Sequence, residues 1–250
     1  MPRLRPFWTL LPIVAVIVVG SVAHSVVDAR LRARLMRADP DSIAADAGLT
    51  AAVVALARPA YAAHCAVCHG ADLKGSSLTG VPDLTDQDWL YGDGRVTDVE
   101  QTILYGIRAG DGRTRNLADM PAFAHERPYR RYDVAPLEPG AIRDVAEYLL
   151  VAAHKPGDAA AASRGRTIFQ DRGMCFDCHE ADAQGDSSIG APNLLDDIWL
   201  HGRGTRADII DTIEHGSAGI CPAWAPQLPA VTIRALAVYI HRASRGQPEG

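Results

Sequence analysis

The sequence predicts an all-α protein in which two tandem helical domains follow an N-terminal transmembrane helix. Three observations lead to this fold class: an apolar run near the start, a block of motifs that occurs twice, and apolar residues at helical spacing without sustained strand alternation. The 250 residues are 48% hydrophobic and 22% charged, which is ordinary for a folded protein. The predicted parts are an anchor at 1–28, a juxtamembrane segment at 29–49, a first domain at 50–153, a linker at 154–162 and a second domain at 163–250.

The apolar run covers residues 7–27 and contains no charged side chain. As a helix it is roughly 31 Å long, which is enough to cross the hydrocarbon core of a bilayer. Arg3 and Arg5 precede it, so the positive-inside rule places the N-terminus in the cytoplasm and the remaining chain in a bacterial periplasm. A cleaved signal peptide is the alternative, with Ser21-Val22-Ala23 as its cleavage site. Both interpretations export the domains from the cytoplasm.

The net charge of −5 favours some kinds of binding partner over others. Nucleic acid selects for basic protein surfaces, so an acidic chain argues against it. If the partner is charged, complementarity favours a basic one.

The repeat is visible as pairs of motifs in the same order. The pairs are CAVCH at 65–69 with CFDCH at 175–179, GVPDL at 80–84 with GAPNL at 190–194, WLYG at 89–92 with WLHG at 199–202, and MPAF at 120–123 with CPAW at 221–224. The first three pairs share one offset in residue number, which we call the repeat offset. The last pair has a shorter offset, which indicates a deletion in the second copy. Two copies make two homologous domains and not a solenoid.

Each copy contains three segments with helical character. A first helix ends at the CxxCH motif, and the other segments carry apolar residues at i, i+3, i+4 and i+7. The expected helices begin near Ala52 and Ser163, occupy 98–105 and 206–214 in the middle, and occupy 141–150 and 232–242 at the end of each copy.

The CxxCH motif is the attachment site of a c-type haem. Its two thiols add to the porphyrin vinyl groups, and the histidine that follows binds the iron. The motif therefore predicts two covalently bound haems c, with thioether cysteines Cys65, Cys68, Cys175 and Cys178 and iron ligands His69 and His179. A four-cysteine zinc site would leave both histidines and the wide separation unexplained.

A sixth iron ligand is expected from the loop with the Pro-Ala-aromatic motif. Met120 follows His69 in the first copy, and a methionine opposite a histidine raises the haem potential. The second copy has Cys221 at the matching position. Three alternatives remain for the sixth ligand of the second haem. Cys221 binds the iron as a thiolate, or His215 or an open position takes the place of Cys221, or Cys221 is an inert buried thiol. Met174 precedes the second motif on the histidine side and is a poor substitute.

Two further pairs of residues are candidates for contacts around the haems. Pro82 and Pro192 follow the two haem histidines at the same spacing, and a carbonyl there accepts the histidine Nδ1–H bond. Trp89 and Trp199 are candidate indole donors to a haem propionate, with core packing as the alternative.

Taken in order, these motifs resemble the membrane-anchored di-haem subunit III of cbb3-type cytochrome c oxidases. The resemblance covers nearly the whole chain and is carried by residues 46–49, 65–70, 82–92, 105–108, 120–123, 190–194 and 236–239. It implies tandem class I cytochrome c domains that pass electrons from a periplasmic cytochrome c or a cytochrome bc complex to the haem-copper core of the oxidase. The subunit is then an electron carrier of the respiratory chain, not an enzyme, and its site has no catalytic residue.

Two residues depart from the pattern of this family. Cys221 stands where the family has methionine, and Glu180 follows the second motif where glycine is usual. A thiolate stabilises ferric iron and lowers the potential, which would slow a relay through that haem. The alternatives are therefore a free-standing anchored di-haem carrier for another periplasmic redox enzyme, or a haem-based sensor that uses a Cys-ligated second haem.

Overall fold

The computed structural model describes residues 25–128 and 134–247, which are mostly helical and contain only isolated β-bridges in place of strands. Residues 25–37 form a helix. The helices that follow are α2 (Pro40–Ile43), α3 (Ala47–His64), α4 (Ala66–His69), α5 (Val96–Tyr105), α6 (Pro139–Ala152), α7 (Ala159–Gln170), α8 (Phe176–His179), α9 (Arg206–His215) and α10 (Ala230–Ala243). The predicted all-α character and the three expected helices of each copy are confirmed.

Side-chain caps explain where several of these helices begin. The Asp46 side chain accepts a hydrogen bond from the second residue of α3, and Asp158 does the same at α7. Thr205 and Asp208 form a reciprocal capping box at the start of α9. These caps explain why α3 and α7 start somewhat earlier than the apolar spacing alone predicts.

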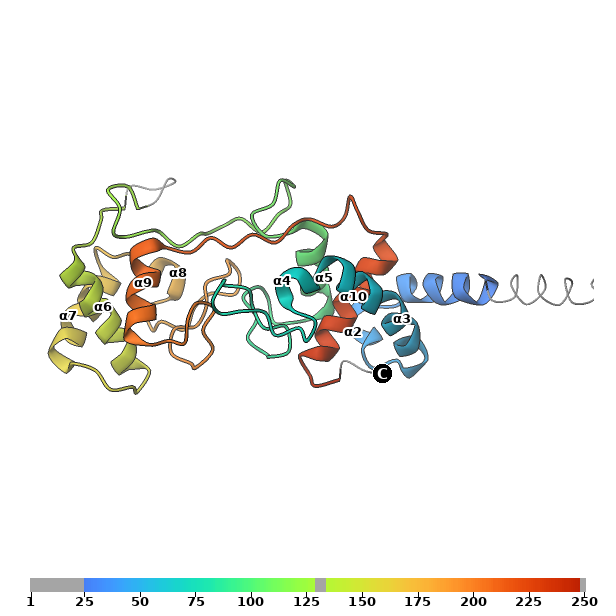
Figure 1. The fold of residues 1–250 in the computed structure, drawn as a ribbon, viewed down its shortest axis with the longest axis horizontal. Coiled ribbons are helices and arrows are strands. Elements are labelled where there is room, and N and C mark those ends of the chain that lie inside the picture. Colours follow the sequence, from blue (N-terminus) through green and yellow to red (C-terminus); the bar gives the residue numbers. More distant parts are fainter. Residues whose placement is uncertain (1–24, 129–133, 248–250) are drawn as a thin grey trace, which may run out of the picture.

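The described helices form two bodies, and neither body coincides with one repeat (Figure 1). The first body contains α2, α3, α4, α5 and α10, and the second contains α6, α7, α8 and α9. The last helix of each repeat therefore packs on the other repeat. The predicted boundaries 50–153 and 163–250 delimit the repeats, but they do not delimit the packed bodies.

In the first body, α10 fills the place that chain order would give to α6. Ile233 and Leu236 of α10 are fully buried in the same core cluster as Leu49 and Val53 of α3. On the outer side of this core, the buried Glu100 carboxylate of α5 accepts hydrogen bonds from Arg234 of α10, each 2.8 Å long.

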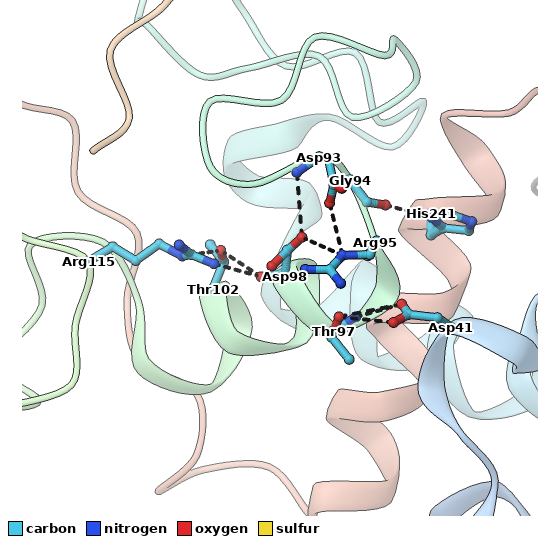
Figure 2. Close-up of polar contacts among 9 residues, drawn as sticks. All are labelled: Asp41, Asp93, Gly94, Arg95, Thr97, Asp98, Thr102, Arg115 and His241. Carbon is cyan, nitrogen blue, oxygen red and sulfur yellow. Dashed lines mark hydrogen bonds and ion pairs between the residues drawn. The ribbon is translucent and has the colours of Figure 1, made fainter. Parts of the chain in front are cut away.

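A second set of polar contacts fixes the start of α5, as Figure 2 shows. His241 of α10 donates its Nδ1–H to the Gly94 carbonyl at 2.7 Å. The backbone N–H and the hydroxyl of Thr97 donate to the Asp41 carboxylate of α2, both at 3.1 Å. Segments from both repeats thus meet around the same helix end.

In the second body, α6 lies directly against α7. A Cβ at Gly165 of α7 would lie 1.9 Å from the Asp144 carbonyl oxygen of α6, so the two backbones touch. Phe169 is fully buried and its ring meets that of Tyr148, with the centroids 5.2 Å apart. The predicted linker at 154–162 therefore contains a tight turn within one body, and it does not separate two bodies.

The two bodies are joined by two long connections that run between them in opposite directions (Figure 1). The Arg108 side chain links these connections, because its guanidinium donates to the Gly219 carbonyl at 2.6 Å and to the Ala118 carbonyl at 2.8 Å. Matched loops of the two bodies also meet. The Gly92 N–H donates to Ser187, and the equivalent Gly202 N–H of the second repeat donates to Ser77.

The predicted membrane anchor at 1–28 lies almost entirely outside the described residues. Within residues 25–128 and 134–247, no helix has the length and apolar character needed to cross a membrane.

Candidate functional site: two haem-binding motifs and exchanged loops

Each CxxCH motif lies on a single helical turn that follows a longer helix, directly after α3 in the first copy and after the turn at 171–174 that ends α7 in the second. The first cysteine precedes α4 or α8, and its carbonyl accepts the histidine N–H at 2.9 Å in both copies. One turn brings the two cysteines to the same side of the helix, as the attachment of two neighbouring vinyl groups requires. All five cysteines of the chain are free thiols. We call Cys65, Cys68 and His69 the first site and Cys175, Cys178 and His179 the second site.

Both histidines are held by the predicted proline carbonyls. The Nδ1 atom of His69 lies 3.3 Å from the Pro82 oxygen, and that of His179 lies 3.0 Å from the Pro192 oxygen. Burial lowers the pKa of both imidazoles, which favours the neutral form that binds a metal. With Nδ1–H donated to the carbonyl, the Nε2 lone pair is available for the iron.

Two glycines that sequence reasoning missed make this contact possible. Gly75 and Gly185 have φ angles of +59° and +81°, and a Cβ at either would lie within 2.5 Å of the proline carbonyl oxygen. Only a residue without a side chain allows so close an approach. Their separation along the chain was the available signal, because it equals the repeat offset.

The residue after each histidine has a backbone conformation that suits glycine. Gly70 has φ +74° and ψ 159°. Glu180, in the second copy, is held at φ 60° and ψ 164°, which is a region that residues with a side chain rarely adopt. The departure at Glu180 that the sequence revealed is therefore a strained backbone position.

We expect Glu180→Gly to stabilise the chain by about 1 kcal/mol. The relief of a strained non-glycine conformation is worth about 1–3 kcal/mol, and the greater freedom of glycine in the unfolded chain offsets part of it. Urea unfolding followed by circular dichroism measures the change. Glu180→Ala is the matched control, since it removes the charge and keeps the Cβ. Equal gains from both variants would contradict backbone strain as the cause.

The two predicted tryptophans have matched positions. A Cβ at Gly94 or Gly204 would lie 2.1 Å from the indole Nε1 of Trp89 or Trp199, so each indole edge lies against a glycine. Within the described residues, Trp199 Nε1 is buried and has no hydrogen-bond partner. A buried N–H without a partner costs free energy, and an acceptor from a bound group would satisfy it.

The loops expected to supply the sixth ligands are exchanged between the sites. Met120 packs against the core of the second body together with Cys175. Cys221 lies near Cys65 and Cys68, and its proximity contributes, after burial, to raising the pKa of Cys65 to about 11. Chain order predicts Met120 near the first site and Cys221 near the second. In the structure Met120 lies with the second body and Cys221 lies beside the first site, because each loop leads into the helix that packs there.

The other candidates for a sixth ligand lie elsewhere. His215 is exposed at the end of α9, where its Nδ1 donates to the Asp211 carbonyl at 3.0 Å. Met174 is exposed at the start of the second motif.

A cluster of acidic side chains lies where the two bodies meet. Burial raises the pKa of Asp86 to about 6, against the opposing effect of a hydrogen bond from the Asp88 N–H, and the carboxylates of Asp83, Asp88 and Asp196 add smaller repulsive effects that raise it further. Asp86 and Asp88 follow the first proline motif, and Asp196 follows the second. Carboxylates from both repeats thus lie close to one another.

The residues present fit a covalently attached haem c. Each site offers two free thiols on one helical turn and a histidine anchored through Nδ1. The second body adds the buried indole N–H of Trp199, which has no acceptor in the part of the chain that the structure describes.

Comparison with known proteins agrees with this chemistry. The sequence profile of the family described as cytochrome c oxidase, cbb3-type, subunit III matches residues 160–240, and the cytochrome c profile matches residues 54–152. The chain is 40% identical over 189 residues to the cbb3-type cytochrome c oxidase subunit FixP of Azorhizobium caulinodans, which covers 75% of this chain and 59% of the relative. The chain therefore spans about three fifths of the length of that relative.

The chain matches a larger share of the length of two other relatives. The subunit CcoP of Cereibacter sphaeroides is 33% identical over 225 residues, or 90% of this chain and 73% of the relative. The subunit FixP of a Bradyrhizobium strain is 37% identical over 219 residues, or 86% of this chain and 69% of the relative. Both sites, their supporting prolines and these relatives lead to the same conclusion. The chain belongs to the family of cbb3-type cytochrome c oxidase subunits FixP and CcoP, and its domains are those of cytochromes c.

Proposed function

We propose that this chain carries two haems c and passes electrons to the catalytic core of a cbb3-type cytochrome c oxidase. The observation that carries the proposal is the pair of matched CxxCH sites, each with its histidine held by a proline carbonyl. The names of the relatives support the oxidase as the destination.

The residues of each site have distinct tasks in this proposal. The cysteine pairs attach the haem, and the histidine Nε2 binds the iron. The proline carbonyl orients the imidazole and increases its basicity. A haem c bound in each site supplies one-electron chemistry. His179 is 9% exposed and His69 is half-buried, so both sites would limit the access of water to a bound iron and the reorganisation that accompanies a change of charge.

The proposal includes a location and a set of partners. Residues 1–28 anchor the chain in the bacterial inner membrane, and both bodies lie in the periplasm. A soluble cytochrome c or a cytochrome bc complex donates electrons, and the haem-copper core subunits accept them. The acidic balance of the chain favours a donor with a basic surface. The chain itself performs no oxygen chemistry.

The test uses the full chain in its native membrane. We expect it to co-purify in mild detergent with a large haem-copper subunit, and the complex to consume oxygen when supplied with reduced cytochrome c. His69→Ala and His179→Ala should each lower this rate by tenfold or more, while oxygen reduction from a small reductant that reaches the core directly is retained. His125→Ala, in an exposed loop, is the control. Purification of the chain always alone would contradict the proposal.

A further inference from the structure

The helix of residues 25–37 carries several arginines directly after the expected membrane anchor. It projects from the first body (Figure 1). Its last turns are held to that body, because Leu35 is fully buried in the core and the Arg34 guanidinium donates to the Asp46 carboxylate at 2.6 Å. The arginines are therefore carried on a helix that is tied to the first body. They are Arg30, Arg32, Arg34 and Arg37.

Three of these arginines line one hollow. Arg30, Arg34 and Arg37 have the spacing that places side chains on one face of a helix. Together with Ala33 and Ala38 they surround an open hollow of about 340 Å³, which lies within the range of small-ligand sites. The short alanine side chains leave the space between the arginines free. We call these five residues the arginine pocket.

The carboxylates that precede and follow the pocket in the sequence are engaged elsewhere. Asp28 pairs with Arg32 at 2.8 Å. Asp39 accepts the Asp41 N–H at the start of α2, and Asp41 accepts hydrogen bonds from Thr97 of α5 (Figure 2). These acidic side chains are thus bound to groups outside the pocket.

Two guanidinium groups of the pocket consequently have no counter-charge. Arg34 is paired with Asp46. In the part of the chain that the structure describes, neither Arg30 nor Arg37 forms an ion pair or a side-chain hydrogen bond. The pocket therefore presents an excess of positive charge and several N–H donors to a ligand, although the chain as a whole is acidic.

With residues 1–28 as the anchor, the pocket lies just outside the hydrocarbon core of the membrane. The apolar run ends at residue 27, so Arg30 follows it by about 4.5 Å and Arg37 by about 15 Å along the helix. Side chains of a helix tilt toward its N-terminus, which here is the direction of the bilayer. Val26 and Val27, at the start of the same helix, are 43% and 54% exposed, as expected of side chains that face lipid.

We propose that the arginine pocket binds the phosphate group of an anionic phospholipid in the periplasmic leaflet of the inner membrane. The proposal rests on the membrane location in the proposed function and is independent of the haems. Guanidinium groups donate paired hydrogen bonds to phosphate oxygens and are only weakly hydrated, so they suit this ligand. The bound lipid neutralises Arg30 and Arg37 and fixes the height of the first body above the membrane.

A free phosphate ion offers the same charge and the same acceptor oxygens. The position of the pocket favours the lipid. Val27 lies one helical turn before Arg30, so a molecule whose phosphate contacts the arginine can place its acyl chains against exposed apolar side chains. An inorganic ion gains nothing from those side chains.

The test uses the full chain with its haems, purified in a nonionic detergent. Native mass spectrometry counts bound lipid during titration with phosphatidylglycerol, which is anionic, or with phosphatidylcholine of the same acyl chains, which is zwitterionic. We expect phosphatidylglycerol to be retained in preference. Arg30→Gln and Arg37→Gln should each weaken its binding by about fivefold, the effect of one arginine near an anionic membrane surface.

Arg32→Gln is the matched control, because it removes the same charge from the same helix outside the pocket. It should leave the binding of phosphatidylglycerol nearly unchanged. Equal losses from Arg30→Gln and Arg32→Gln would overturn the proposal, since net charge alone would then attract the lipid. Circular dichroism of each variant verifies that the chain is folded.

Two other results would overturn the choice of ligand. Inorganic phosphate at millimolar concentration is added in a separate titration, and displacement of phosphatidylglycerol by it would make a free ion the ligand. Variants at Arg30 or Arg37 that lose the haem-copper subunit during purification, yet bind phosphatidylglycerol as the natural chain does, would assign the pocket to a protein contact.

Failure of this inference differs from failure of the proposed function. The pocket is separate from both haem sites, so its variants should attach both haems and keep the α-band of the natural chain. A chain that passes electrons to the oxidase but binds no lipid at the pocket would contradict this inference alone. A chain that binds phosphatidylglycerol through Arg30 and Arg37 but never associates with an oxidase would contradict the proposed function and leave this inference intact.

Discussion

A chain cut down to the first repeat, residues 50–153, is expected not to form a folded haem domain. In the full chain, α3 and α5 bury their apolar faces against α10, which the cut removes. The remaining α6 would expose Ile142, Val145 and Leu149, because their core partners are on α7 and α9. Circular dichroism measures the loss of helix, and amide hydrogen exchange measures the loss of protection. We expect the truncated chain to lose most of the amide protection that the full chain has.

A recombined chain is the matched control for that truncation. Residues 25–110 joined to residues 219–247 through a short flexible linker contain every helix of the first body. We expect this chain to fold and to attach one haem, although it is not contiguous in the natural sequence. A stable, protected fold of residues 50–153 together with an unfolded recombined chain would contradict the exchange of the last helices.

Arg234→Met is expected to destabilise the first body by about 3–5 kcal/mol, since removal of one partner leaves the other as an uncompensated buried charge. The side chains of Arg234 and Glu100 are only 13% and 9% exposed, and they join α10 to α5. This loss is a large part of the stability of an ordinary domain. Urea unfolding followed by circular dichroism measures it.

Arg32→Met tests the same change at an exposed pair. Arg32 contacts Asp28 at 2.8 Å on the helix of residues 25–37, and their side chains are 43% and 48% exposed. An exposed ion pair contributes about 0–1 kcal/mol, so this variant should be nearly as stable as the natural chain. If both substitutions lowered the free energy of unfolding by similar amounts, burial would not be the reason for the large effect of Arg234→Met.

Much of each site was predictable because its chemistry depends on spacing along the chain. The cysteines and histidine of a CxxCH motif share one helical turn, and Pro82 and Pro192 lie at a fixed distance in sequence from their histidines. The helices were predictable from apolar spacing, and their ends were less so because caps such as Asp46 lie outside the apolar pattern.

The exchange of loops and helices was not predictable from motif order. Two homologous repeats offer two nearly equivalent surfaces for α6 and for α10, and the apolar pattern of a helix does not distinguish between them. One signal was available in the short turn between α6 and α7, since helices joined by a short connection usually pack together. The composition of residues 154–162 instead favours a linker between domains.

Cleavage of the chain in that turn tests the exchange most directly. Residues 156 and 157 are exposed, and a protease site inserted between them leaves the Asp158 cap of α7 in place. If the last helices are exchanged, the two fragments each contribute to both bodies, so the nicked chain should elute as one species. It should separate only at the urea concentration that unfolds the bodies. Two fragments that separate in native buffer, each folded and carrying its own haem, would contradict the exchanged arrangement.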